Sequence, residues 1–148
     1  MLAGGGPEEE RLRARLGRTA TFLGWLDGDA LATAYASADV FLFCSATDTF
    51  GQVVLEAQAS GLPVVAVAAG GPAELICDGR SGLLCPPRAE ALGGAVAGLA
   101  GSRAVRERLA RGGLAAVRER TWEASLAGLA AGWSRALAPA VGAARRAA

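Results

Sequence analysis

Short apolar runs alternate with segments of helical character along this chain. Val40–Cys44 and Leu62–Val67 are two such runs, rich in β-branched and aromatic residues, and they flank the stretch Asp48–Gly61. Because the middle stretch has helical spacing, the order is strand, helix, strand. This order predicts a β–α–β unit, and so two neighbouring strands of a parallel sheet.

The ends of this central helix are marked by residues with known end preferences. Thr49 and Gln52 have the Thr-x-x-Gln spacing of a capping box, which predicts Thr49 as the cap. Gly61 fits the left-handed position that closes a helix, and Pro63 follows where no helix can continue.

The alternation continues on both sides of the unit. Pro7 and Pro72 each suit the first position of a helix, and Gly112-Gly113 is expected to break or kink the helix that contains it. We expect further strands at 1–3, 19–23 and 83–85, and helices at 7–16, 30–37, 72–76, 89–99, 102–119 and 121–137. The pattern predicts one α/β domain over residues 1–138 and a frayed tail over 139–148.

The start of the central helix has the features of an anion site. Backbone N–H groups of Phe50, Gly51 and Gln52 point out of the positive helix end, and Gly51 lets a ligand approach closely. Asp48 lies just before the helix, and Glu56 lies roughly 9 Å further along its axis than Phe50. Two carboxylates around an anion site fit the layout of a nucleotide-sugar: sugar, pyrophosphate, ribose.

Structural interpretations of the same residues stay open at this stage. Asp48 could be a turn residue, Thr49 a plain cap, and Glu56 a solvated side chain. The helix is apolar over most of its circumference, however, so it should be largely buried. A buried carboxylate without a partner is costly, which favours a ligand or a specific polar partner for Glu56.

Phe50-Gly51, Glu56–Gly61 and Leu62–Val65 resemble the central motif of the retaining GT-B glycosyltransferases of family 4, the glycosyl transferases group 1. The resemblance is to their carboxy-terminal, donor-binding half. It implies a Rossmann-like parallel sheet flanked by helices, the second half of a GT-B fold. Asp48 stands where the family has Glu, which keeps the charge but shortens the reach by one methylene.

The resemblance also implies a function. The full enzyme would transfer a hexose from UDP- or GDP-hexose to a sugar, lipid or other hydroxyl acceptor, with retention at the anomeric carbon. Glu56 would hold the ribose hydroxyls and Asp48 the donor sugar, and these two are the candidate catalytic residues. The backbone at Thr49–Gln52 would hold the diphosphate, and the leaving phosphate would itself act as the base.

Other donor contacts follow from the same resemblance. Gly70 and Gly71 would border the donor through backbone N–H groups, and Trp25 would either stack near the base or simply cover the sheet end. Asp27-Gly28-Asp29 matches a metal-binding triplet of an unrelated fold, but ordinary helix-start chemistry explains it better. We expect no metal and no other cofactor.

Composition narrows the alternatives. The chain has 148 residues, a net charge of +1 and no histidine, which argues against a nucleic-acid partner and excludes Ser-His-Asp, Cys-His and histidine-metal chemistry. All 15 basic residues are arginine, a bias typical of a GC-rich bacterial gene. Cys44, Cys77 and Cys85 lack paired spacing, and the sequence contains no apolar stretch long enough for a membrane span. We expect a cytoplasmic protein, with peripheral attachment to the inner membrane as an option.

The resemblance leaves parts of the family's pattern unmatched. The amino-terminal acceptor domain and the first strand and loop of the donor domain have no counterpart in this sequence. A non-catalytic nucleotide-sugar-binding fragment is therefore the alternative to an enzyme, and the central motif disfavours a third reading, a sugar epimerase. Without an acceptor domain, Leu126, Leu129 and Trp133 should form an exposed apolar stripe on the carboxy-terminal helix, prone to self-association.

Overall fold

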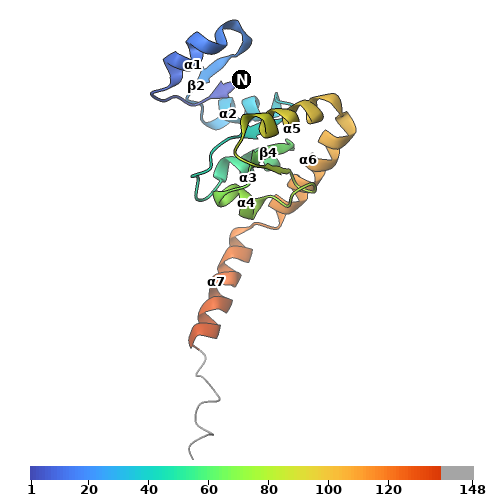
Figure 1. Ribbon diagram of the computed structural model, residues 1–148. Coiled ribbons are helices and arrows are strands. Elements are labelled where there is room, and N and C mark those ends of the chain that lie inside the picture. Colours follow the sequence, from blue (N-terminus) through green and yellow to red (C-terminus); the bar gives the residue numbers. More distant parts are fainter. Residues whose placement is uncertain (138–148) are drawn as a thin grey trace, which may run out of the picture.

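The computed structural model describes residues 1–137, so the predicted tail over 139–148 lies outside the described residues. The chain is an α/β protein of parallel strands flanked by helices, as expected (Figure 1). Its strands form two sheets rather than one. β1 (Leu2–Ala3) pairs with β2 (Phe22–Gly24), and β4 (Val64–Val67) lies between β3 (Phe41–Phe43) and β5 (Leu83–Cys85).

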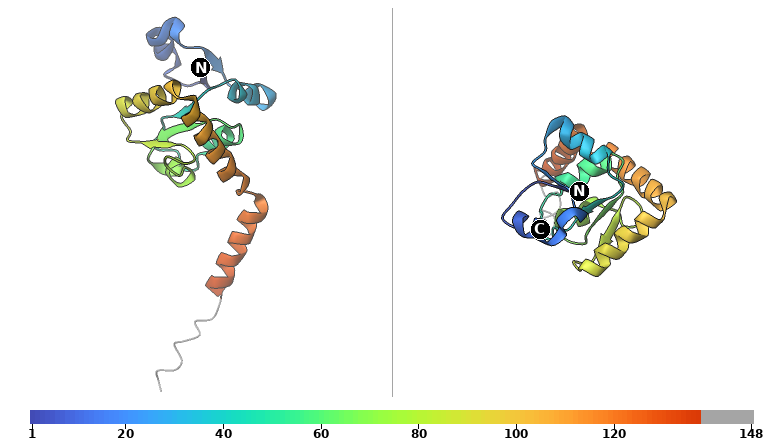
Figure 2. Two further views of the ribbon diagram at one scale, coloured as in Figure 1. Left: turned by 90° about the vertical axis from the view of Figure 1, so that its right-hand side faces the viewer. Right: turned by 90° about the horizontal axis from the view of Figure 1, so that it is seen from above.

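The helices follow the predicted alternation closely. Their bounds are α1 Glu9–Leu16, α2 Gly28–Ala36, α3 Gln52–Ala59, α4 Gly70–Leu75, α5 Ala89–Gly101, α6 Arg103–Arg118 and α7 Trp122–Leu137, with a 3₁₀ turn at Gly17–Thr19. The small β1–β2 sheet and α1 lie at one end of the molecule, while α7 extends away from the other end (Figure 2).

The core is built on the two faces of β4, whose four residues are all buried. Val64 and Ala66 pack on the side of α3, and Val65 and Val67 pack on the side of α5 and α6. A strand covered on both faces reads as a continuous apolar run, which explains the unbroken sequence Val64–Val67. Because helices cover both faces of this sheet, a ligand can reach it only at the ends of the strands.

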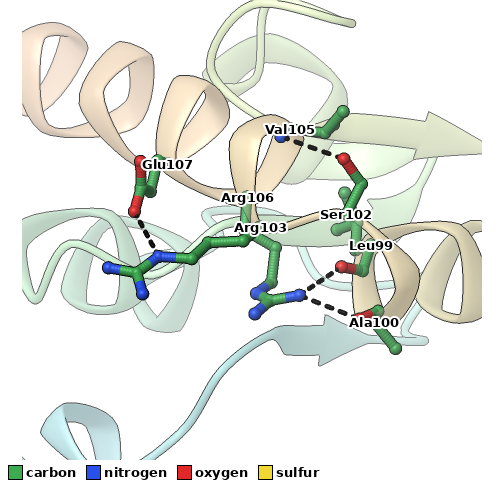
Figure 3. A network of polar contacts seen from close by, with 7 residues as sticks. All are labelled: Leu99, Ala100, Ser102, Arg103, Val105, Arg106 and Glu107. Carbon is green, nitrogen blue, oxygen red and sulfur yellow. Dashed lines mark hydrogen bonds and ion pairs between the residues drawn. The ribbon is translucent and has the colours of Figure 1, made fainter.

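At the turn from α5 into α6, side chains form hydrogen bonds with free backbone groups at the end of α5 and at the start of α6. One guanidinium nitrogen of Arg106 donates to the carbonyl oxygens of Leu99 at 2.7 Å and Ala100 at 3.0 Å (Figure 3). The Ser102 hydroxyl accepts from a backbone N–H of the first turn of α6. These bonds pair groups that helix ends leave unsatisfied, and so set the angle between two helices that cover one face of the sheet.

The helix starts predicted at the two prolines are wrong by two residues, in opposite directions. Pro72 is the third residue of α4, because the chain turns into the helix at Gly70, where φ is 60°. A proline is tolerated there since the first N–H groups of a helix have no intrahelical partner. Pro7 lies in the turn before α1, which begins at Glu9. Gly61 has a φ of 74°, which confirms its predicted left-handed conformation.

The predicted break at Gly112-Gly113 is also wrong, since α6 continues from Arg103 to Arg118. A Cβ at Gly112 would overlap the carbonyl oxygen of Arg80, and a Cβ at Gly113 would lie 3.0 Å from Cγ of Gln58. The two glycines therefore let α6 approach α3 and the turn before β5 more closely than side chains would permit.

We expect Gly112→Ala to destabilise the fold by about 1–3 kcal/mol, because the added methyl group must push α6 away from the Arg80 carbonyl. The matched control is Gly98→Ala on α5, where a Cβ meets nothing within 4 Å. That variant should gain up to about 1 kcal/mol from helix propensity. Urea unfolding of both variants measures the difference, and equal stability of the two would contradict the close approach.

Candidate functional site

The loop between β3 and α3 is held together by the carboxylate of Asp48. Its Oδ1 accepts hydrogen bonds from the N–H of Phe50, at 3.0 Å, and from the N–H of Gly51. α3 begins at Gln52 with Gly51 in the N-cap position, so the predicted Thr49–Gln52 capping box is wrong. Asp48 instead closes the loop just before α3, because its short side chain folds back onto N–H groups two and three residues later.

The tip of α3 thus has an anionic oxygen bound to it already. The N–H groups of Phe50 and Gly51, which the sequence predicts to face a ligand, both point at the Asp48 carboxylate. Negative charge is favoured at this end of a helix by the macrodipole and the unpaired N–H groups. The site therefore has the geometry of an anion cradle whose occupant is part of the chain.

Gly70 and Gly71 lie directly against this loop. A Cβ at Gly70 would overlap the Asp48 carbonyl oxygen, and a Cβ at Gly71 would lie 2.5 Å from the carbonyl carbon of Phe50. The Gly71 N–H donates to the Asp48 carbonyl oxygen at 2.8 Å. Both glycines therefore border the tip of α3, and the N–H of Gly71 is already hydrogen-bonded to the loop.

Glu56 lies about one turn into α3 and is half-buried. Its Oε2 accepts a hydrogen bond of 3.1 Å from the hydroxyl group of Tyr35 on α2. This is the specific polar partner that a carboxylate on a mostly apolar helix requires. Sequence reasoning missed Tyr35, because 21 residues separate it from Glu56 and its place in the apolar stripe of α2 indicated only packing.

The pairing changes the chemistry of the tyrosine. Burial, the hydrogen bond to Glu56 and the negative charge of Glu56 together raise the pKa of Tyr35 to about 12, and burial is the largest of the three causes. Tyr35 therefore stays a neutral hydrogen-bond donor throughout the physiological pH range.

Two exposed aromatic side chains among the predicted site residues follow strands of different sheets. Trp25 follows β2 and is 84% exposed, while Phe50 follows β3 and is 68% exposed. The Trp25 indole nitrogen lies 3.0 Å from the Cβ position of Gly5, so Trp25 borders the turn after β1. Thr49 and Gln52 are exposed beside the tip of α3.

The remaining candidate chemistry has simple structural explanations. Asp27 is in the N-cap position of α2 and Asp29 in its first turn, as predicted for a helix start. Within residues 1–137, His, Cys, Asp and Glu side chains form no group of three that could hold a metal ion. Cys44, Cys77 and Cys85 are free thiols. No helix in this part of the chain is both long and apolar enough to cross a membrane.

A family model described as glycosyl transferases group 1 matches residues 1–102, which is more than half of the 148-residue chain. The chain belongs to this family. A GDP-mannose-dependent alpha-mannosyltransferase of Mycobacterium tuberculosis is 50% identical over 86 residues, which cover 58% of this chain and 22% of the relative. The match thus spans about a fifth of the length of that mannosyltransferase.

Solved structures with the same fold confirm the expected GT-B architecture. Sucrose-phosphate synthase from Thermosynechococcus elongatus has 32% identity and a TM-score of 0.77, covering 91% of this chain and 37% of that chain. Anabaena HepE in complex with UDP has 26% identity and a TM-score of 0.72, covering 88% of this chain and 36% of that chain. The chain therefore matches just over a third of each of these solved structures.

Tyr35 is the only tyrosine of the chain, so its ionisation can be followed by tyrosinate absorbance. The folded state favours the neutral phenol, because the pKa rises from 10.0 to about 12. The resulting stabilisation is complete below pH 10 and is lost as the pH rises towards 12. We expect Glu56→Gln to lower the pKa of Tyr35 while leaving it above 10.0, since burial remains.

Absorbance titrations of the wild type and Glu56→Gln, with circular dichroism to confirm folding at each pH, measure this difference. Identical titration curves for the two folded proteins would contradict the contact between Tyr35 and Glu56.

Proposed function

We propose that this chain binds a nucleoside diphosphate hexose and acts as the donor-binding domain of a retaining hexosyltransferase. The observation that carries the proposal is the anionic oxygen of Asp48 bound by two adjacent N–H groups at the tip of α3. A donor diphosphate brings anionic oxygens suited to the same cradle, and in exchange the Asp48 carboxylate becomes available to hydroxyl groups of the donor sugar.

We extend the proposal to the other candidate residues. In this proposal Glu56, further along α3, accepts hydrogen bonds from the ribose hydroxyls, and Gly70 and Gly71 line the diphosphate. Trp25 borders the base. The relatives support a nucleotide-sugar donor and leave the base open, because one is named for GDP-mannose and a solved structure holds UDP.

The proposed reaction breaks the bond between the anomeric carbon of the hexose and the diphosphate oxygen. A bond to the acceptor hydroxyl oxygen forms on the same face of the sugar, and the acceptor proton passes to the leaving phosphate. N–H groups at the tip of α3 stabilise the negative charge that develops on that phosphate. The acceptor is a sugar, a lipid or another hydroxyl compound, and no step of the proposal uses a metal.

A second candidate function is nucleotide-sugar binding without turnover. The share of the relatives that the chain matches, 22% of the mannosyltransferase, favours this candidate for the chain on its own. Transfer and donor hydrolysis, assayed with the chain alone and with an amino-terminal acceptor half supplied, separate the two candidates. Activity in either arrangement supports the enzyme, and binding without activity in both supports the binding module.

Calorimetry with UDP, GDP and their hexose conjugates tests the proposed function directly. We expect saturable binding of one nucleotide series, and about 10- to 100-fold weaker binding by Glu56→Gln, because a charged acceptor for hydroxyl groups is lost. The control is Glu90→Gln in the exposed first turn of α5, which should bind as the wild type does. Failure of the wild type to bind any of these compounds would refute the proposal.

We infer in addition that α7 mediates contact with another polypeptide. Its apolar side chains are 52–81% exposed and lie along one side of the helix: Trp122, Leu126, Leu129, Trp133 and Leu137. The two charged residues of α7, Glu123 and Arg135, lie near opposite ends of the helix. Two copies of α7 packed stripe against stripe would cover both apolar surfaces, while Arg135 lies on the side of each helix away from the seam.

Analytical ultracentrifugation over a range of concentrations tests this self-association. We expect the wild type to dimerise, and Leu129→Glu to shift the equilibrium towards monomer by at least about tenfold, since a charge would enter the apolar seam. Ala131→Glu places the same charge on the opposite side of the helix and should leave the dimer intact. A wild type that stays monomeric at every concentration would rule out pairing through α7.

A further inference from the structure

Tyr35 connects α2 to α3, the helix whose tip forms the anion cradle. It projects from α2, and its hydroxyl group lies 3.1 Å from Oε2 of Glu56 and 3.5 Å from the carbonyl oxygen of Val53, both on α3. A phenol has one proton to donate, and an ionised carboxylate is the stronger acceptor. The shorter bond to Glu56 is therefore the one that the tyrosine donates.

The position of this hydroxyl group is set by the sheet. The Tyr35 ring packs against Phe41 with a centroid distance of 5.6 Å and an interplanar angle of 58°. Phe41 stacks in turn on Phe43, at 6.2 Å and 12°. Both phenylalanines belong to β3, the strand that leads into the loop of Asp48. The contact with Phe41, which is itself held by Phe43, restricts the tyrosine ring, so the hydroxyl group is a fixed reference point for Glu56.

We propose that Tyr35 is the positioning residue for Glu56, holding Oε2 so that Oε1 is presented to the ribose hydroxyls of the donor. This inference rests on the proposed function. It deepens that function by assigning a role to a residue that would touch no part of the ligand and acts only through the carboxylate.

Positioning has a thermodynamic consequence that packing alone does not have. A glutamate on a helix surface samples several rotamers, and a ligand that binds it must suppress them. A carboxylate already held by Tyr35 loses less freedom on binding, so the ligand gains affinity without an added contact. This gain appears only for ligands that use Glu56.

The test compares nucleotides that differ only in the groups that Glu56 would contact. Binding of UDP, GDP and their 2′,3′-dideoxy counterparts is measured by calorimetry for the wild type and Tyr35→Phe, which keeps the packed ring. We expect Tyr35→Phe to weaken binding of the ribose form by about 3- to 10-fold, and of the dideoxy form by less than about 2-fold. A purely structural effect would weaken both forms equally.

Ser60→Ala is the matched control. It also removes a hydroxyl group, but one that donates to the backbone carbonyl oxygen of Glu56 at 2.9 Å and not to its carboxylate. We expect it to bind both nucleotide forms as the wild type does. Thermal unfolding verifies that every variant is folded at the temperature of measurement.

A double-mutant cycle separates action through Glu56 from any other effect of Tyr35. In a Glu56→Ala background, Tyr35→Phe should weaken binding of the ribose form by less than about 2-fold, because the carboxylate it positions is gone. Equal losses with and without Glu56, or equal losses for ribose and dideoxyribose forms, overturn the inference alone. Failure of the wild type to bind all four nucleotides overturns the proposed function, and the inference with it.

Discussion

The loop at residues 48–51 depends on Asp48, because this residue accepts hydrogen bonds from the loop itself and from the start of α4. Its carboxylate caps the N–H groups of Phe50 and Gly51, and its carbonyl oxygen accepts from Gly71 at the start of α4. β3 enters this loop and α3 leaves it, so the same residue joins a strand and two helices. A cradle fixed in three directions is preorganised, and the groups that line it need not be ordered when a ligand arrives.

Glycines make this arrangement sterically feasible, because they let the backbones of two segments approach each other closely. Side chains at Gly70 or Gly71 would collide with the backbone of the Asp48 loop. The same device recurs at Gly112, where α6 meets the carbonyl group of Arg80. In both places a pair of glycines brings two backbones together at a point distant in sequence, so each pair acts as a packing element and not as a helix breaker.

The helices and strands of this fold could be predicted well from the sequence, because each depends on the pattern of apolar and polar residues within its own segment. The buried run Val64–Val67 and the left-handed Gly61 were predicted correctly from periodicity and backbone preference. The start of α3 was not, since Asp48 binds the N–H groups of Phe50 and Gly51 and accepts from Gly71, a contact that the local sequence pattern does not reveal. The partner of Glu56 was missed for the same reason, being supplied by the packing of α2 against α3.

The hydrogen bonds of Asp48 at the tip of α3 also determine which contacts can contribute to the free energy of donor binding. Without Asp48, an empty site would leave two N–H groups unpaired, at a cost of about 1–3 kcal/mol for each one that is buried. A diphosphate that displaces the carboxylate exchanges one anionic oxygen for another, so the net gain at the tip is only the difference between two similar interactions. The larger part of donor affinity in the proposed function must therefore arise away from the tip, where no group of the chain competes. Glu56 is the nearest charged acceptor on α3, and its geometry is set by Tyr35. In the proposed function the tip thus fixes where a donor binds, and the Tyr35–Glu56 pair contributes to how tightly it is held.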